Sequence, residues 1–197
     1  MCCLALSWGW YRWTTITLLA YHGACRVGEP LKALRRDLLL PDEAGLSVRV
    51  CFLNISAPKP GRRGRGRQQH TKITDLHTVQ LAEEFLQELP VDGALYPSSL
   101  SSYRRRWDRI LSELEIPVAA ALTPGCLRGG GAVWLYHQGT PVSDIQWVMR
   151  LRHQQTLEHY LQETAAIGVL HMLPKGSKEK VRSCAAMFPY VHRSLIS

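Results

Sequence analysis

The chain has 197 residues, of which 46% are hydrophobic and 20% charged, so it is long enough for one folded domain and too apolar for a disordered protein. Lysine and arginine number 24 against 16 acidic residues, and the net charge of +8 favours a polyanionic partner, nucleic acid before anionic membrane; a soluble protein that is merely basic is the alternative. The six cysteines are scattered and lack zinc-ligand spacing, and scattered thiols in a chain of this length are typical of a reducing compartment. No apolar run reaches the roughly 18 residues of a membrane span. The apolar start lacks a basic leader, so we expect a protein that is not secreted.

The first third of the chain predicts helices that lead into a β-hairpin. Apolar residues recur at helical spacing over 8–22, Gly23 ends that helix, and a short helix with Pro30 in its first turn follows. Residues 47–55 have the β-branched and aromatic composition of a strand, and 68–74 form a weaker second one. The intervening APKPGRRGRGR carries many cations and no acid, which predicts a mobile basic loop.

The rest of the chain predicts amphipathic helices separated by turn residues. We expect them over 76–89, over 98–115 with Ser98 or Ser99 as N-cap, from Thr123-Pro124 to about Gln138, over 141–151 and over 156–167. The predicted fold class is mainly α with a small antiparallel β-hairpin or sheet (α+β). One domain covers 1–168, and a polar tail, mobile or docked on a neighbouring protomer, covers 169–197.

Three motifs place arginine, histidine and tyrosine in a characteristic order. In GACRVGEP, Arg26 follows a helix-ending turn and Glu29 comes three residues later. In TPGCLRGGG, Arg128 lies in the first turn of a helix, and LRHQQTLEHYLQE carries His153 and Tyr160. In order and spacing the set resembles the catalytic domain of tyrosine recombinases, the phage-integrase family, from about residue 8 to about residue 167.

This resemblance implies a site and an activity. Its catalytic residues would be Arg26, Lys59, Arg128, His153 and Tyr160, with Glu29 supporting Arg26 and with Lys72 as the rival of Lys59. The implied activity is DNA breakage and rejoining through a covalent 3′-phosphotyrosine, without a nucleotide, metal or other cofactor. Two arginines would stabilise the charge that builds on phosphorus, a lysine would protonate the leaving oxygen, and the histidine would hydrogen-bond the phosphate. A phenol ionises near about pH 10 in water, so such a nucleophile needs cations beside it.

The sequence departs from the family pattern at two places. Gly125 stands where the family has the histidine of His-x-x-Arg, so that acid–base position is empty, and water, His70 or His137 would have to replace it. The spacing from His153 to Tyr160 is two residues shorter than in many bacterial members, which rotates a helical side chain by about 200°. Residues 153–156 must therefore form a turn if Tyr160 is to face inward. The DNA-clamping domain usual in the family is also missing from this sequence.

Double-stranded DNA is the predicted partner, with self-association on DNA and no membrane role. The loop cations would bind phosphates or form a nuclear-import signal: Arg62, Arg63, Arg65 and Arg67. We expect the protein in the nucleus if it is eukaryotic and otherwise in the cytoplasm. A merely solvated loop is the alternative. Two other functions stay open, a catalytically degenerate DNA-binding remnant of a mobile element and a basic protein-interaction domain. Tyr160 would then be a helix residue that fixes packing.

Overall fold

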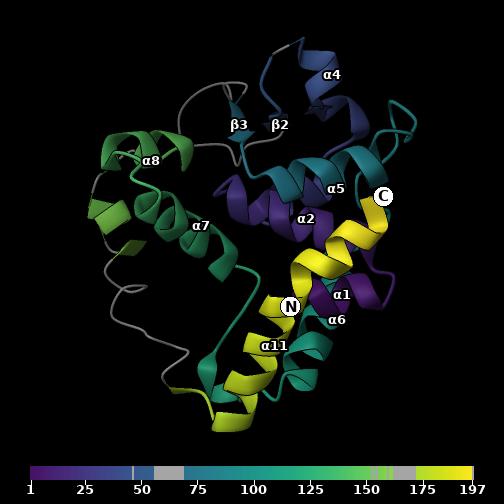
Figure 1. The fold of residues 1–197 in the computed structure, drawn as a ribbon. Helices are drawn as coiled ribbons and strands as arrows, with labels where there is room; N and C mark the ends of the chain where they lie inside the picture. Colours follow the sequence, from purple (N-terminus) through teal and green to yellow (C-terminus); the bar gives the residue numbers. More distant parts are fainter. Residues whose placement is uncertain are drawn as a thin grey trace.

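The computed structural model is mainly helical, at 63% helix, with a small three-stranded antiparallel sheet, which confirms the expected fold class (Figure 1). The structure describes residues 1–45, 47–55, 69–151, 153, 155–158, 160–161 and 172–196. Its helices include α1 (Cys2–Ser7), α2 (Tyr11–His22), α3 (Gly28–Lys32), α4 (Pro41–Ala44), α5 (Leu76–Leu86), α6 (Leu100–Glu113), α7 (Cys126–His137), α8 (Val142–Val148) and α11 (Lys175–Ile196), and residues 155–158 and 160–161 are also helical. Short 3₁₀ helices occupy Arg35–Asp37 and Val118–Ala120.

Helix α2 forms the centre of the fold, between α5 on one side and α7 on the other (Figure 1). Its residues Trp13, Ile16 and Leu19 are fully buried. The Trp13 indole N–H donates to the carbonyl of Tyr103 at 3.1 Å, which joins α2 to α6. The helix begins at residue 11 rather than residue 8, because Gly9 takes a left-handed φ of 73° and separates α2 from α1.

The sheet is anchored beside the C-terminal end of α2. Strands β1 (Leu38–Leu39), β2 (Cys51–Ile55) and β3 (Gln69–Ile73) pair in that order, with β2 and β3 forming the predicted antiparallel hairpin. Strand β1 was not predicted, because two residues show no periodicity. The Thr71 hydroxyl of β3 donates to the carbonyl of Gly23 at 2.7 Å, so the hairpin is fixed where α2 ends.

The helix boundaries decide where the predicted site residues lie. Ser99 caps α6 by accepting the amide of Ser102, which selects Ser99 from the two predicted N-caps. Helix α7 begins at Cys126, so Arg128 is its third residue. Helix α8 ends at Val148, three residues before the predicted end, and this leaves Arg150 in a turn.

The C-terminal segment forms a helix that the sequence pattern did not predict. Residues 175–196 form α11, which packs against α1 and α5 of the same chain (Figure 1). Val181 and Cys184 pack against the main core, and the Ser177 hydroxyl donates to the carbonyl of Glu115 at 2.6 Å. The polar composition of residues 175–196 did not indicate a packed helix, because α11 buries only a narrow stripe of its surface. Within the described parts of the chain, no helix is long and apolar enough to cross a membrane.

Candidate active site

Arg26 and Glu29 meet at the turn that follows α2. Ala24 adopts a left-handed φ of 44°, and the amide of Cys25 bonds back to the carbonyl of Ala20 at 3.1 Å, so the chain reverses sharply before Arg26. Glu29 lies in the first turn of α3, where its carboxylate accepts the Arg26 amide at 2.8 Å. The same carboxylate lies 3.6 Å from the Arg26 guanidinium, whose side chain is 52% exposed. The turn thus presents one solvent-facing guanidinium beside a shielded carboxylate.

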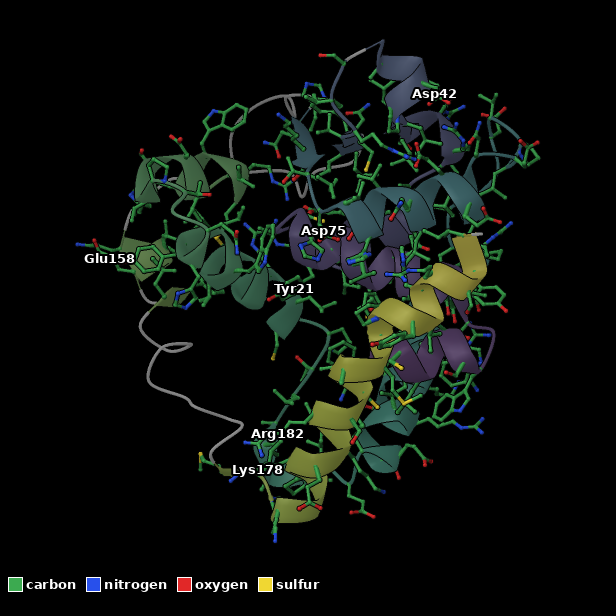
Figure 2. All side chains as sticks on the ribbon, in the orientation of Figure 1. Tyr21, Asp42, Asp75, Glu158, Lys178 and Arg182 are labelled. Atoms are coloured by element: carbon green, nitrogen blue, oxygen red, sulfur yellow. The ribbon has the colours of Figure 1, made fainter. Side chains whose placement is uncertain are left out.

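Arg128 reaches this turn because α7 packs very closely on α2. A Cβ atom on Gly131 would lie 1.9 Å from the Tyr21 carbonyl oxygen, and one on Gly130 would lie 2.9 Å from the Tyr21 ring. In Figure 2, Tyr21 lies where α7 meets α2. The glycine run therefore allows close helix packing, and it holds the N-terminal half of α7 against the end of α2. Arg128 is consequently only 5% exposed.

Arg150 lies in the turn at the C-terminal end of α8, and its side chain reaches Glu29. The amide of Arg150 bonds to the carbonyl of Trp147 at 2.9 Å, and the amide of Leu151 bonds to that of Gln146 at 3.0 Å, which is the Schellman pattern of a helix C-terminus. Arg150 occupies its left-handed position with a φ of 56°, where glycine is usual and where another residue costs about 1–2 kcal/mol. Its guanidinium donates to Glu29 at 2.6 Å.

The Glu29 carboxylate therefore lies beside two guanidinium groups, those of Arg26 and Arg150, and the Arg128 guanidinium interacts electrostatically with all three residues. These four residues form the pocket. Arg128 donates through Nη2 to the carbonyl of Met149, the residue before Arg150. Burial, and then the charges of Arg26 and Arg150, lower the pKa of Arg128, while Glu29 and Tyr160 act in the opposite direction. Beneath them, burial raises the pKa of the Cys25 thiol to about 12, so Cys25 stays a neutral thiol.

Two guanidinium nitrogens in this pocket have no acceptor among the residues that the structure describes. They are Nη1 of Arg128 and Nη1 of Arg150, and both are buried. A buried donor without an acceptor costs about 1–3 kcal/mol, and more when it is charged. Two such donors in a site with a net positive charge are suited to an anion with several acceptor oxygens.

Tyr160 lies close enough to Arg128 to influence its ionisation. It is half-buried and packs against a second hydrophobic cluster that includes Ile145, Met149 and Leu157. Of the turn expected over 153–156, the structure describes one hydrogen bond, from the amide of Thr156 to the carbonyl of His153 at 3.2 Å. Glu158, labelled in Figure 2, marks this helical segment beside α7 and α8.

The remaining predicted residues are less closely connected to the pocket. His153 is exposed, and so is Gly125, whose position offers no side chain. Lys72 and His70 are exposed on β3, and Lys72 points away from the face on which Thr71 contacts Gly23, since neighbouring residues alternate across a strand. His137 ends α7, about 13 Å along the helix axis from Arg128. The predicted general acid and the loop cations lie outside the described residues: Lys59, Arg62, Arg63, Arg65 and Arg67.

Sequence reasoning did not assign Arg150 to the site. The predicted helix 141–151 placed this arginine inside a helix, whereas α8 ends at Val148 and Arg150 lies in the turn that follows. An arginine at a position where a helix-ending glycine is usual is the signal that could have identified it. In the described ranges, no three histidine, cysteine or acidic side chains gather as metal ligands would.

Comparison with known proteins gave no match to a family model, a curated protein or a solved structure.

Proposed function

We propose that the chain binds double-stranded DNA and breaks and rejoins it through a covalent 3′-phosphotyrosine on Tyr160, as a domain of tyrosine-recombinase type. One observation carries this proposal: Arg128 and Arg150 each have a buried guanidinium nitrogen that lacks an acceptor in the described part of the chain. Tyr160 lies close enough to Arg128 to raise its pKa. A phosphodiester supplies the missing acceptor oxygens, and the chain's net charge of +8 favours association with DNA.

The charge of the pocket suits phosphoryl transfer. Three arginines and one glutamate leave two net positive charges, and the phosphodiester gains negative charge as a nucleophile adds to phosphorus. Preorganised donors of this kind contribute roughly 3–4 kcal/mol each, by analogy with oxyanion-hole deletions. Burial strengthens these interactions because the local dielectric constant is low.

The proposed step is balanced without a cofactor. The Tyr160 oxygen bonds to phosphorus while the bond from phosphorus to the 5′ oxygen breaks. The phenol loses its proton to solvent, and the departing 5′ oxygen gains one from Lys59, the proposed general acid. The phosphotyrosine keeps the ester bond, so a 5′ hydroxyl can reverse the step and rejoin the strand.

A catalytically degenerate DNA-binding domain is the second candidate. Gly125 favours it, because the position three residues before Arg128, which holds a histidine in recombinases, carries no side chain and is exposed. Such a domain would keep the phosphate-binding arginines and bind DNA with a steep dependence on salt, but it would form no adduct.

A nicked suicide duplex distinguishes the two candidates. The nick lets a short leaving strand diffuse away after cleavage, so that a covalent protein–DNA adduct accumulates and can be counted on a denaturing gel. Because the cleavage site is unknown, a library of nicked duplexes of random sequence provides the substrate. We expect an adduct with the wild-type protein and none with Tyr160→Phe.

Tyr136→Phe is the matched control, since Tyr136 lies on the same helix as Arg128 but about 12 Å along its axis, and its side chain is 51% exposed. Adducts that persist in Tyr160→Phe would exclude Tyr160 as the nucleophile. Tight salt-dependent binding of the wild type without an adduct would support the degenerate domain, and absence of DNA binding at low salt would support the protein-interaction domain.

A further inference from the structure

We propose that Arg150 is a third phosphate-binding arginine of the pocket, positioned by the C-terminal turn of α8 and by Glu29. This inference rests on the proposed function for its substrate, but the site itself can be tested with a simple anion. It assigns a specific role to a residue that the sequence motifs did not select.

The C-terminal turn of α8 sets the direction of the Arg150 side chain. The Schellman bonds of Arg150 and Leu151 fix the backbone at the end of α8, and Arg128 holds the carbonyl of Met149 immediately before it. The side chain that leaves this turn is only 12% exposed, and it reaches Glu29 at 2.6 Å. A long, charged side chain is therefore buried at a backbone conformation that favours glycine.

Glu29 does not satisfy all of the donors that Arg150 presents. One Glu29 oxygen accepts both the Arg26 amide and the Arg150 Nη2 group, and the other oxygen lies 3.6 Å from the Arg26 guanidinium. Glu29 therefore satisfies one arm of the Arg150 fork and leaves Nη1 buried without an acceptor among the described residues. Arg128 has the same arrangement there, with Nη2 on a carbonyl and Nη1 without an acceptor.

Like charges gather around Arg128. Burial, and then the charges of Arg26 and Arg150, lower the pKa of Arg128, and the Glu29 carboxylate acts in the opposite direction. If Arg150 served only to anchor α8 to Glu29, its Nη2 group would be satisfied, but its Nη1 group would stay buried near the Arg128 charge, which repels it, without an acceptor among the described residues. An anion between the two Nη1 groups would reverse that repulsion, since each arginine would then attract the same ligand.

Arg150→Gly separates binding from folding. Glycine suits the left-handed φ of 56°, so the variant should fold at least as well as wild type although it loses the ion pair with Glu29. Inorganic phosphate is the probe, and its dissociation constant follows from the rise in urea midpoint against sodium chloride of equal ionic strength. Arg36→Ala removes the same charge from a surface pair with Asp92 and serves as the control.

We expect Arg150→Gly to bind phosphate at least tenfold more weakly than wild type, and Arg36→Ala to change binding less than twofold. The suicide-duplex adduct is then measured for the same proteins. Weaker phosphate binding by Arg150→Gly would support the site even if wild type forms no adduct, in which case the proposed cleavage alone fails. Unchanged phosphate binding by Arg150→Gly, or no phosphate response in wild type, would overturn the inference, whatever the adduct assay shows. Loss of folding in Arg150→Gly, together with an undiminished phosphate response in the uncharged variant Arg150→Gln, would assign Arg150 a packing role instead.

Discussion

Because α7 packs closely on α2, adding a single methyl group at Gly131 should lower the stability of the protein. In Gly131→Ala, the new Cβ would lie 1.9 Å from the Tyr21 carbonyl oxygen and 3.0 Å from its carbon. The obstacle is backbone at the end of α2, so it cannot move as a side chain would. The two helices must separate by about 1.1 Å to restore the 3.0 Å that real Cβ contacts respect.

The expected cost follows from two opposing terms. Overpacking a well-packed interior costs about 1–3 kcal/mol, and more where backbone must move, while replacing a helical glycine by alanine returns about 1 kcal/mol. We expect a net loss of about 2 kcal/mol, which lowers the Tm by roughly 4–8 °C in a chain of this size. Separation of α7 from α2 should also move Arg128 away from Arg26 and weaken phosphate binding.

Gly130→Ala is the matched control for this substitution. Its Cβ would lie 2.9 Å from a ring carbon of Tyr21, a half-buried side chain that can rotate aside. Urea unfolding followed by far-UV circular dichroism should place Gly130→Ala within about 1 kcal/mol of wild type. Equal stability of the two variants would refute the close approach of Gly131 to the α2 backbone.

Three further predictions concern other parts of the molecule. Burial lowers the pKa of both His192 and His22, so below the usual histidine pKa of about 6.5 the unfolded chain binds more protons than the folded one. The urea midpoint should therefore fall as pH drops from 7.5 to 5.5, and His192→Gln should reduce that fall; a midpoint independent of pH would contradict the burial of these rings. Ser99→Ala should cost about 1 kcal/mol because the α6 cap is removed, whereas Ser98→Ala should be neutral in the same thermal melt, and equal effects would contradict the observed cap. Replacing Arg62, Arg63, Arg65 and Arg67 by alanine should flatten the slope of log affinity for duplex DNA against log salt by about 0.9 for each phosphate that the loop neutralises, and an unchanged slope would show that the loop touches no phosphate.

Local patterns in the sequence were sufficient for most of the secondary structure. The β-branched run ending at Ile55, the cap at Ser99 and the stop at Gly23 each depend on contacts within a few residues, and the structure has the expected element at each. Two errors share a cause. Strand β1 and helix α11 are stabilised by distant partners, β2 for one and α1 with α5 for the other, and a local pattern does not contain those partners.

The candidate site divides in the same way. The sequence by itself determined the chemical kinds of residue available, Arg26, Glu29, Arg128 and Tyr160, because spacing and order are properties of the chain. Only the tertiary structure decided that Arg150 belongs with them and that His153 is exposed. The physical reason is that a helix end sets the direction of the next side chain, and α8 ends three residues earlier than its hydrophobic pattern indicates, just before Met149, whose carbonyl accepts a hydrogen bond from Arg128 of α7. That hydrogen bond joins residues 21 positions apart, and it exists only once α8 has packed on α7.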